Sequence, residues 1–513
     1  MIPADFIMVG AVITMSPGLP RAEAVAVRDG VIAAVGTACE VMALEGPGTR
    51  VFDCRNRAVV PGFIDAHCHI LASAAARLSV DCSPEVVRSI PDIQARLRAR
   101  ASEVSRGVWI RATGYNEFYL PGKLHPTRHD LDVAAPSNPV RLVHRSGHAC
   151  VLNSMAMSLL GIDASSEDPP GGVIDRDPAT GEPTGRLFGA IDYWGGRFPR
   201  LGEDEIADGV NVFGKELLAS GITSVVDATA TNGYEEWRVL DGFCQSGYLK
   251  SRVSMMVSPK AMGDFCECGA ALGAMGMVRI GGVKIVVDES SGDVFPAPAD
   301  LEEMLMSAHA AGFQTAQHAV EGRPLEAAVG ALAKVLTKMP RRDHRHRIEH
   351  CSLCPPRVRQ SLKELGLVVV SQPVFVYQNG ERYLQTVASR DISSLYPFGE
   401  LLRDGVAVAA GSDSPTGAIS PLVGIYAAVT RTAENGQTVS VGQAVEPEQA
   451  LAMYTRDAAF ATFSDGSLGV LAPGRRADMV VLSDDPLSCP KGHIKDTKVE
   501  MTLIDGRVVY ESG

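Results

Sequence analysis

The sequence predicts an α/β protein: a (β/α)8 barrel, a small β-sandwich built from both termini, and a long insertion after barrel strand one. Three observations support this. Strand-like apolar runs alternate with helix-like segments over residues 59–463. Short strands and turns fill residues 1–58 and 464–513, and neither end alone has enough strands for a stable sheet. One interval, about 71–214, interrupts the alternation.

The predicted barrel strands are short apolar runs, several of them bounded by glycine or proline. They span residues 59–69, 221–227, 252–257, 282–288, 313–318, 346–350, 367–372 and 406–413. That makes eight, the number of parallel strands that closes a barrel of this kind. An amphipathic helix is expected at 301–311, with Asp300 as its N-cap and Gly312 at its end, and another at 450–462.

Both ends of the chain contain short apolar runs separated by turn residues. Residues 24–35 and 501–510 each read as a hairpin with Asp-Gly at the turn, and residues 6–15 and 477–482 read as single strands. Because a few strands are marginal by themselves, we expect both ends to combine in one β-sandwich.

Composition and charge exclude several classes of protein. The chain has 513 residues, 46% of them hydrophobic and 21% charged, with a formal net charge of −12. It contains no basic tract, so nucleic acid is not an expected partner. No apolar run reaches the ~18 residues of a membrane span, and the N-terminus shows no export signal. We therefore expect a cytoplasmic protein with no membrane partner, a small-molecule substrate, and assembly into a homo-oligomer, a dimer or tetramer.

The 11 cysteines are scattered, and in a cytoplasmic protein they are expected to be reduced. Cys351 and Cys354 have the spacing of a zinc knuckle, but no second pair completes four ligands. We interpret this pair as structural.

Metal-ligand residue types recur at predicted strand ends. His67 and His69 are two apart on a strand, so both side chains point the same way and can grip one cation. The remaining candidates are Lys284 in strand four, His318 at the end of strand five, His350 at the end of strand six and Asp413 at the end of strand eight. Their convergence at one barrel face predicts a metal centre.

Each of these residues also has a structural alternative. His350 would then pair with Arg347 or Glu349, Lys284 would pair with Asp288, and Asp413 would form a turn or cap. Four further histidines lack strand-end placement, and we interpret them as surface or helix residues: His309, His344, His346 and His493.

The run Pro61-Gly-Phe-Ile-Asp-Ala-His-Cys-His69 resembles the first-strand signature of the amidohydrolase superfamily. The order of two histidines, a lysine, two histidines and an aspartate matches that superfamily's binuclear pattern. The insertion holds Gly147-His148 followed by Asn153-Ser154, similar to the family 3 branch that includes the N-substituted formamide deformylases. The resemblance implies a terminal β-sandwich, a metal-dependent barrel and a carboxylated Lys284.

The expected cofactor is a divalent metal, one or two ions, with zinc favoured by imidazole ligands and iron, cobalt or manganese left open. Such a cation lowers the pKa of bound water to about 7. Asp413 would accept the proton of that water and pass it to the leaving amine. Lys284 is unusual, because an ammonium ligates no metal, whereas its carbamate would supply anionic oxygen.

The expected reaction is hydrolysis of a C–N bond in an amide, formamide, carbamate or urea with a largely apolar N-substituent. Trp109, Tyr115 and Tyr377 are expected to supply aromatic contacts, and His148 a polar anchor. Arg145 would instead favour an acidic substrate such as an N-acyl amino acid. Ester hydrolysis, or a non-catalytic barrel that serves binding or assembly, stays open.

The sequence departs from the family 3 branch at two loops. The run after Lys284 is Asp288-Glu-Ser-Ser-Gly292 where Asp-Gly-Ser is expected, and Glu321 and Gly322 exchange the usual glycine and acid after His318. Neither change touches a proposed ligand, so both bear on the shape of the substrate pocket alone.

Overall fold

Eight parallel strands form the barrel sheet, and all eight predicted strands are present. In sheet order they are β5 (Phe63–Cys68), β12 (Ile222–Asp227), β13 (Arg252–Val257), β15 (Val278–Val286), β18 (Thr315–Ala319), β19 (Arg347–His350), β20 (Val368–Ser371) and β21 (Ala407–Ala410). A short strand, β14 (Ala274–Met275), pairs antiparallel with β15. In this computed structural model the described residues are 2–189, 193–194, 196–199, 201–267, 274–275, 277–290 and 292–513.

The chain divides into two compact units. One comprises Met1–His69, Gly214–Asp288 and Pro296–Gly513 and contains the barrel. The other comprises Ile70–Phe213 and Glu289–Phe295. The second unit therefore begins directly after β5, where the sequence predicts the long insertion.

The last barrel strand meets the first one. The backbone N–H of Asp413 donates to the carbonyl of His67 at 2.7 Å, and the N–H of Ser412 donates to Oδ1 of Asp65 at 2.9 Å. Gly411 makes this approach possible, because a Cβ atom there would lie 2.6 Å from the nitrogen of His67. Closure of the ring thus places two predicted ligands, His67 and Asp413, beside each other.

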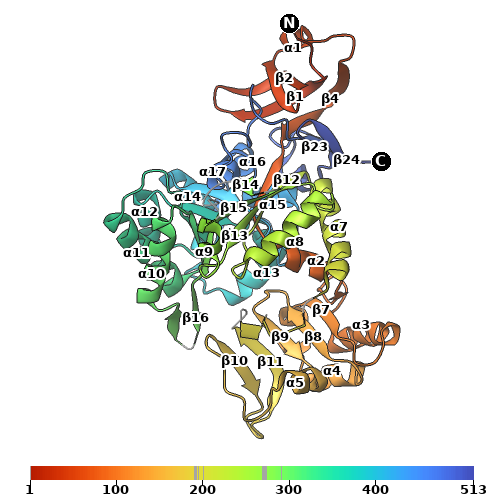
Figure 1. Cartoon of the computed structure of the whole chain (residues 1–513), viewed down its shortest axis with the longest axis vertical. Coiled ribbons are helices and arrows are strands. Elements are labelled where there is room, and N and C mark those ends of the chain that lie inside the picture. The colour runs from red at the N-terminus through yellow and green to blue at the C-terminus, as the bar shows by residue number, and fades with distance from the viewer. Residues whose placement is uncertain are drawn as a thin grey trace. The chain divides into compact units, whose positions relative to one another are not determined.

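Helices alternate with the barrel strands (Figure 1). Those before or between the strands are α7 (Glu203–Ala219), α8 (Tyr234–Gln245), α9 (Met262–Glu267), α10 (Pro298–Ala310), α11 (Gly322–Lys338), α12 (Pro356–Glu364), α13 (Val374–Thr386) and α14 (Phe398–Asp404), with the 3-10 turn η3 (Ile392–Ser394). After the last barrel strand come α15 (Pro421–Thr430), the 3-10 turn η4 (Val441–Gln443), α16 (Pro447–Met453) and α17 (Arg456–Ala461), and a further 3-10 turn, η5 (Lys491–Asp496), lies between two C-terminal strands. Within the described ranges, every helix is too short or too polar to span a bilayer.

Two predicted helices differ in detail from the structure. Helix α10 begins three residues before Leu301, with Ala297 as the N-cap and Pro298 at its start, so Asp300 lies in the first turn. Proline suits a first helical position because its missing N–H has no helical partner there. The helix expected at 450–462 is two helices, α16 and α17, interrupted at Tyr454 and Thr455.

Strands from both termini form one seven-stranded sheet with the order β24-β23-β22-β4-β1-β2-β3. The N-terminal members are β1 (Phe6–Ser16), β2 (Leu19–Arg28), β3 (Val31–Gly36) and β4 (Arg50–Pro61), with α1 (Ala38–Met42) between β3 and β4. The C-terminal members are β22 (Met479–Leu482), β23 (Val499–Ile504) and β24 (Arg507–Glu511). Val59 and Val60 pair with β22, so the strand predicted at 59–69 is two strands that separate at Gly62.

This terminal sheet is bent so that its two Asp-Gly hairpin turns, at Gly30 and Gly506, lie against each other, as in a β-sandwich. Gly506 lies against Val27 and Gly30, and the carbonyl of Gly30 accepts a hydrogen bond from Ala477. Phe6, Met8, Met479 and Leu503 share one buried cluster, so both termini contribute to a single core. Figure 1 draws the red N-terminal strands beside the blue C-terminal ones.

The second unit has a six-stranded sheet with the order β10-β11-β9-β8-β7-β6. Its strands are β6 (Val80–Asp81), β7 (Ile110–Tyr115), β8 (Val140–His144), β9 (Ala149–Leu152), β10 (Gly172–Arg176) and β11 (Pro183–Gly189). Its helical elements include α2 (Ile70–Arg77), α3 (Ile90–Glu103), η1 (Glu117–Tyr119), η2 (Pro121–Lys123), α4 (Arg128–Ala134) and α5 (Ser154–Leu160). A two-stranded sheet pairs β16 (Asp288–Ser290) with β17 (Asp293–Phe295).

Candidate metal centre

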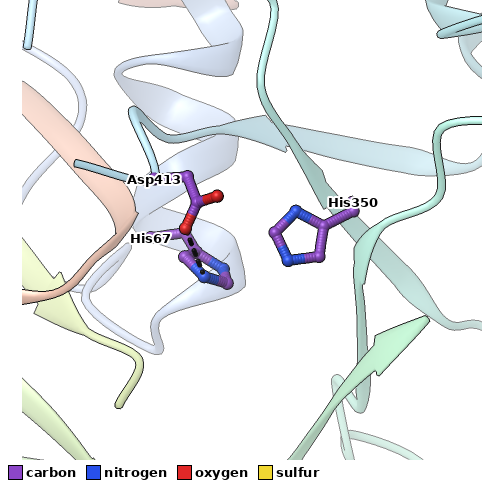
Figure 2. Close-up of side chains that lie close together, drawn as sticks. All are labelled: His67, His350 and Asp413. Carbon is purple, nitrogen blue, oxygen red and sulfur yellow. Dashed lines mark ion pairs between the residues drawn. The ribbon is translucent and has the colours of Figure 1, made fainter. Parts of the chain in front are cut away.

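Three predicted ligands come together at the ends of barrel strands. His67 lies in β5, His350 ends β19 and Asp413 follows β21, and each is buried. Each offers one ligand atom, and these atoms lie within 4.8 Å of one another. Figure 2 shows the Asp413 carboxylate beside the His67 ring, with the His350 ring facing them from another strand.

His69 joins this group through Asp413. Its Nε2 lies 3.1 Å from Oδ1 of Asp413, and Nε2 of His67 lies 3.4 Å from the same oxygen. The His69 side chain is about a quarter exposed, at 26%, whereas that of His67 is 1% exposed. One carboxylate therefore faces both histidines of the predicted pair.

His318 and Lys284 lie on the neighbouring strands β18 and β15. The ring of His318 has its centroid 4.4 Å from that of His350, so it is next to the three-residue cluster without belonging to it. Lys284 pairs in register with Ala316 and is 2% exposed. The Lys284 ammonium has no hydrogen-bond partner among the described residues, so the alternative pairing with Asp288 is wrong.

Burial changes the acidity of Lys284. Removal from water lowers its pKa to about 8, while the negative charges of Glu349 and Asp413 act in the opposite direction. A buried amine with no partner and a lowered pKa is partly neutral near pH 8. Lys284 is thus chemically able to act as a nucleophile toward CO2.

The Nδ1 atoms of three histidines are already engaged. His67 Nδ1 lies 2.5 Å from Oε2 of Glu349, His69 Nδ1 lies 3.0 Å from the hydroxyl of Thr229, and His350 Nδ1 lies 2.8 Å from Oε1 of Gln372. Because a neutral imidazole has one donor and one acceptor nitrogen, these contacts leave Nε2 as the ligand atom. The alternative that paired His350 with Glu349 is wrong, since Glu349 contacts His67.

Asp413 stays ionised at neutral pH. Burial alone would raise its pKa, but the side chains of His67 and His69 beside its carboxylate hold the pKa well below its usual range. Asp413 and His350 also have positive φ angles, 55° and 73°. Left-handed backbone at non-glycine residues is uncommon and clusters at functional sites, where the surrounding structure holds it in place.

This donor set fits a divalent cation. His67, His350 and Asp413 supply two imidazoles and a carboxylate within mutual reach, the ligand types of catalytic zinc sites. Glu349, Thr229 and Gln372 contact Nδ1 of His67, His69 and His350, respectively, and so fix the ring tautomers, which is the usual arrangement around metal-binding histidines. Among the predicted ligands, the amine nitrogen of Lys284 is the buried polar atom that has no hydrogen-bond partner in the described structure. A further group bound beside it would supply that partner.

The predicted substrate-binding residues of the insertion lie in the second unit. Tyr115 is 1% exposed and its hydroxyl is 2.9 Å from Nδ1 of His125, and Trp109 packs edge-on to Phe198. The backbone N–H of Arg145 donates to the Tyr115 carbonyl. The N–H of His148 donates to the Ser146 hydroxyl.

In the first unit, Tyr377 is partly buried in α13, with its ring 5.9 Å from that of Tyr426. Substrate contact by Tyr377 and by the four insertion residues stays a prediction.

Three of the remaining histidines are buried and form a chain. His309 is a helix residue, as interpreted, whereas His344 and His346 lie outside the helices and are not surface residues. His309 lies in α10, and its Nδ1 is 2.8 Å from Nε2 of His346. The N–H of Thr315 donates to Nδ1 of His346, and the N–H of His346 donates to Nδ1 of His344. These contacts keep the rings neutral. His493, in η5, is exposed as expected.

A model of the amidohydrolase family matches residues 50–510. The chain belongs to this family. It is 29% identical to an N-substituted formamide deformylase of Arthrobacter pascens, over 96% of this chain and 95% of that protein. It is 28% identical to the protein LONG AFTER FAR-RED 3 of Arabidopsis thaliana, over 94% of this chain and 88% of that protein. An uncharacterized metal-dependent hydrolase from Pyrococcus horikoshii OT3 has the same fold, with a TM-score of 0.76 and 22% identity over 95% of this chain and 99% of that one.

Sequence reasoning did not identify the residues that hold the histidines. Thr229 and Gln372 follow barrel strands by one or two residues, with no motif to mark them. Glu349 carries a usable signal, because Arg347 and Glu349 are charged residues two apart in a fully buried strand. Charges in such a strand need partners, and Glu349 is paired with Arg347 of its own strand and with His67 of this amidohydrolase.

Proposed function

We propose that this amidohydrolase cleaves a C–N bond other than a peptide bond in a small, largely apolar N-substituted amide, formamide, carbamate or urea. The observation that carries the proposal is the cluster of His67, His350 and Asp413, whose ligand atoms lie within 4.8 Å of one another. Similarity over nearly the whole chain to an N-substituted formamide deformylase supports the choice of bond.

The residues that would hold metal are those predicted from the sequence: His67, His69, Lys284, His318, His350 and Asp413. Zinc, as one or two ions, suits these imidazole and carboxylate ligands. A bound divalent cation supplies Lewis acidity, which makes water a better nucleophile near neutral pH and polarises a carbonyl group.

Asp413 performs the proton transfer in this proposal. Its ionised carboxylate accepts a proton from the attacking water, and the protonated carboxyl then delivers that proton to the leaving amine nitrogen. His67 and His69 both lie within 3.4 Å of Oδ1, so the carboxylate is beside the imidazole nitrogens that would bind the metal. The low pKa of Asp413 keeps it in the basic form before each turnover.

We also propose that Lys284 reacts with CO2. The Lys284 ammonium first loses one proton to solvent. The lone pair of the resulting amine then forms a bond from Nζ to the CO2 carbon, one C=O π pair moves to oxygen, and a second N–H proton is released, which leaves a carbamate. The buried, unpartnered Nζ supports this step, because the carbamate would replace an orphaned cation by an anionic ligand. The intact mass of native protein should show one added CO2, and a free amine in fully metallated, active enzyme would refute the step.

For the substrate, Tyr377 offers a partly buried aromatic surface on α13, the helix that follows barrel strand β20. Trp109 and Tyr115 are proposed as further apolar contacts and His148 as the anchor for the carbonyl or amide. Arg145 is the counter-candidate, because a guanidinium anchor would select a carboxylate-bearing substrate.

The test combines metal analysis with a substrate panel. Purified protein should contain zinc or another divalent metal, and replacement of His67 and His69 by alanine should remove both metal and turnover. The panel sets N-aryl and N-alkyl amides, formamides, carbamates and ureas against N-acyl amino acids. A large advantage in kcat/KM for the N-acyl amino acids would overturn the neutral-substrate proposal, and metal-free, inactive protein would favour a binding module.

A further inference from the structure

A buried carboxylate outside the predicted ligand set contacts one of the proposed ligands. Glu349 lies in β19, one residue before His350, and is 0% exposed. Its Oε2 accepts a hydrogen bond from Nδ1 of His67 at 2.5 Å. The contact joins β19 to β5, two strands that are not neighbours in the barrel sheet.

Arg347 holds this carboxylate from the other side. Its Nε donates to Oε1 of Glu349 at 2.7 Å and its Nη2 donates to Oε2 at 2.8 Å, a two-pronged pair. The same Nη2 donates to the carbonyl of Ala66, the residue before His67, at 2.8 Å. Arg347 thus fixes both Glu349 and the backbone that carries His67.

The charge on Glu349 is maintained by these partners. The guanidinium of Arg347 lies beside both carboxylate oxygens and compensates their buried negative charge. An ionised acceptor at Nδ1 makes the opposite nitrogen of an imidazole a stronger ligand. His69 and His350 have neutral partners at Nδ1, a hydroxyl and an amide, so His67 differs from both in this respect.

A purely structural role does not explain this pair well. Arg347 and Glu349 are two residues apart on one strand, so their ion pair links no separate parts of the fold by itself. Burying two charges is costly, and such pairs are often no more stabilising than apolar side chains of similar size. Within the described residues, this ion pair is joined to β5 by two hydrogen bonds, from His67 to Glu349 and from Arg347 to the carbonyl of Ala66.

We propose that Glu349 is a positioning residue for the metal centre, which orients His67 and strengthens its Nε2 as a ligand, and that Arg347 positions Glu349. The inference rests on the proposed function, because it requires His67 to bind metal. Strand β19 would then supply both a proposed ligand, His350, and the pair that positions another ligand, His67.

Glu349→Gln tests this proposal without a large change in shape. We expect metal affinity, measured by chelator competition on the folded protein, to fall by about 10- to 100-fold. The visible spectrum of the Co(II)-substituted protein should shift as well, a readout that a merely structural role would leave unchanged. Wild-type affinity together with a wild-type Co(II) spectrum would overturn the proposal.

Asp478→Asn is the matched control. Asp478 is also a buried carboxylate in a two-pronged pair, with Nε and Nη2 of Arg252 at 2.9 and 3.1 Å, but it contacts none of the proposed ligands in the described structure. It should lose stability and keep its metal affinity; an equal loss of affinity in this control would overturn the specific role of Glu349.

Two further variants separate the possible failures. If Glu349→Gln does not fold, Glu349→Asp keeps the charge and shortens the side chain, and undiminished metal affinity in that variant would overturn the proposal. His67→Ala separates the two hypotheses. Loss of metal in His67→Ala with none in Glu349→Gln would reject Glu349 alone, whereas full metal binding by His67→Ala would reject the proposed centre itself.

Discussion

Gly411→Ala is expected to damage both the barrel and its metal centre, although glycine and alanine differ by one methyl group. A Cβ atom at Gly411 would lie 2.6 Å from the nitrogen and 2.8 Å from the Cβ of His67. Ordinary contact begins near 3.4 Å, so β21 and β5 would have to separate by about 0.8 Å. The 2.7 Å hydrogen bond from Asp413 to His67 spans the same gap and would lengthen beyond a good hydrogen-bond distance.

The expected cost follows from these two effects. Overpacking a filled interior costs about 1–3 kcal/mol, and a lost backbone hydrogen bond adds about 1 kcal/mol, so unfolding by urea should report a loss of about 2–4 kcal/mol. Displacement of Asp413 from His67 by nearly 1 Å should reduce kcat/KM on the best substrate of the panel by about 100-fold.

Gly330→Ala is the control for the change of residue type. Gly330 lies exposed in α11 with nothing within 4 Å of the added carbon, so alanine should stabilise the helix by up to about 1 kcal/mol and leave turnover unchanged. If Gly411→Ala has the stability and turnover of the wild type, contact between β21 and β5 does not position the site, and this reasoning is wrong.

The remaining predictions concern the proton carrier, the metal and the buried histidines. Asp413→Asn should fold and retain most metal while kcat falls by about 10²- to 10⁴-fold at saturating substrate; near-normal turnover would remove Asp413 from the mechanism. Chelator treatment should abolish turnover and a divalent cation should restore it, whereas a fully active metal-free protein would contradict metal dependence. Burial lowers the pKa values of His309, His344 and His346 in the folded protein, the last to about 2. In the unfolded chain, histidine has a pKa of about 6.5, so the unfolded chain binds protons at a higher pH than the folded protein does. The free energy of unfolding therefore falls as the pH drops below about 6.5. His346→Gln should reduce the slope of unfolding free energy against pH by about 1 kcal/mol per unit between about pH 5.5 and 4.5, and an unchanged slope would show that His346 does not titrate on unfolding.

The barrel was predictable because its strands are marked locally. Apolar runs bounded by glycine or proline and separated by amphipathic helices repeat at barrel spacing, and all eight appear in the structure. The break at Gly62 was not predictable, since Val59 and Phe63 belong to one apolar run. Pairing with β1 on one side and with β22, more than 400 residues away, on the other assigns Val59 to the terminal sheet.

The candidate centre was predictable to the extent that ligand types sit at strand ends. His67, His350 and Asp413 could be placed at one face by that rule alone. Their supporting contacts could not, because His67 and Glu349 are 282 residues apart and no local pattern relates them. The buried chain of His309 and His346 was missed for the same reason: a histidine whose partners come from other elements looks like any polar residue in a helix or loop.

The position of β4 inside the terminal sheet has a consequence for biosynthesis. β4 pairs with β1 on one side and with β22 on the other. From Pro61 to Met479 the ribosome must add 418 residues, roughly 20–80 s at about 5–20 residues per second. During that time the apolar edge at Val59 and Val60 has no partner strand, and such edges template aggregation. A nascent chain therefore exposes this edge until β22 leaves the ribosome.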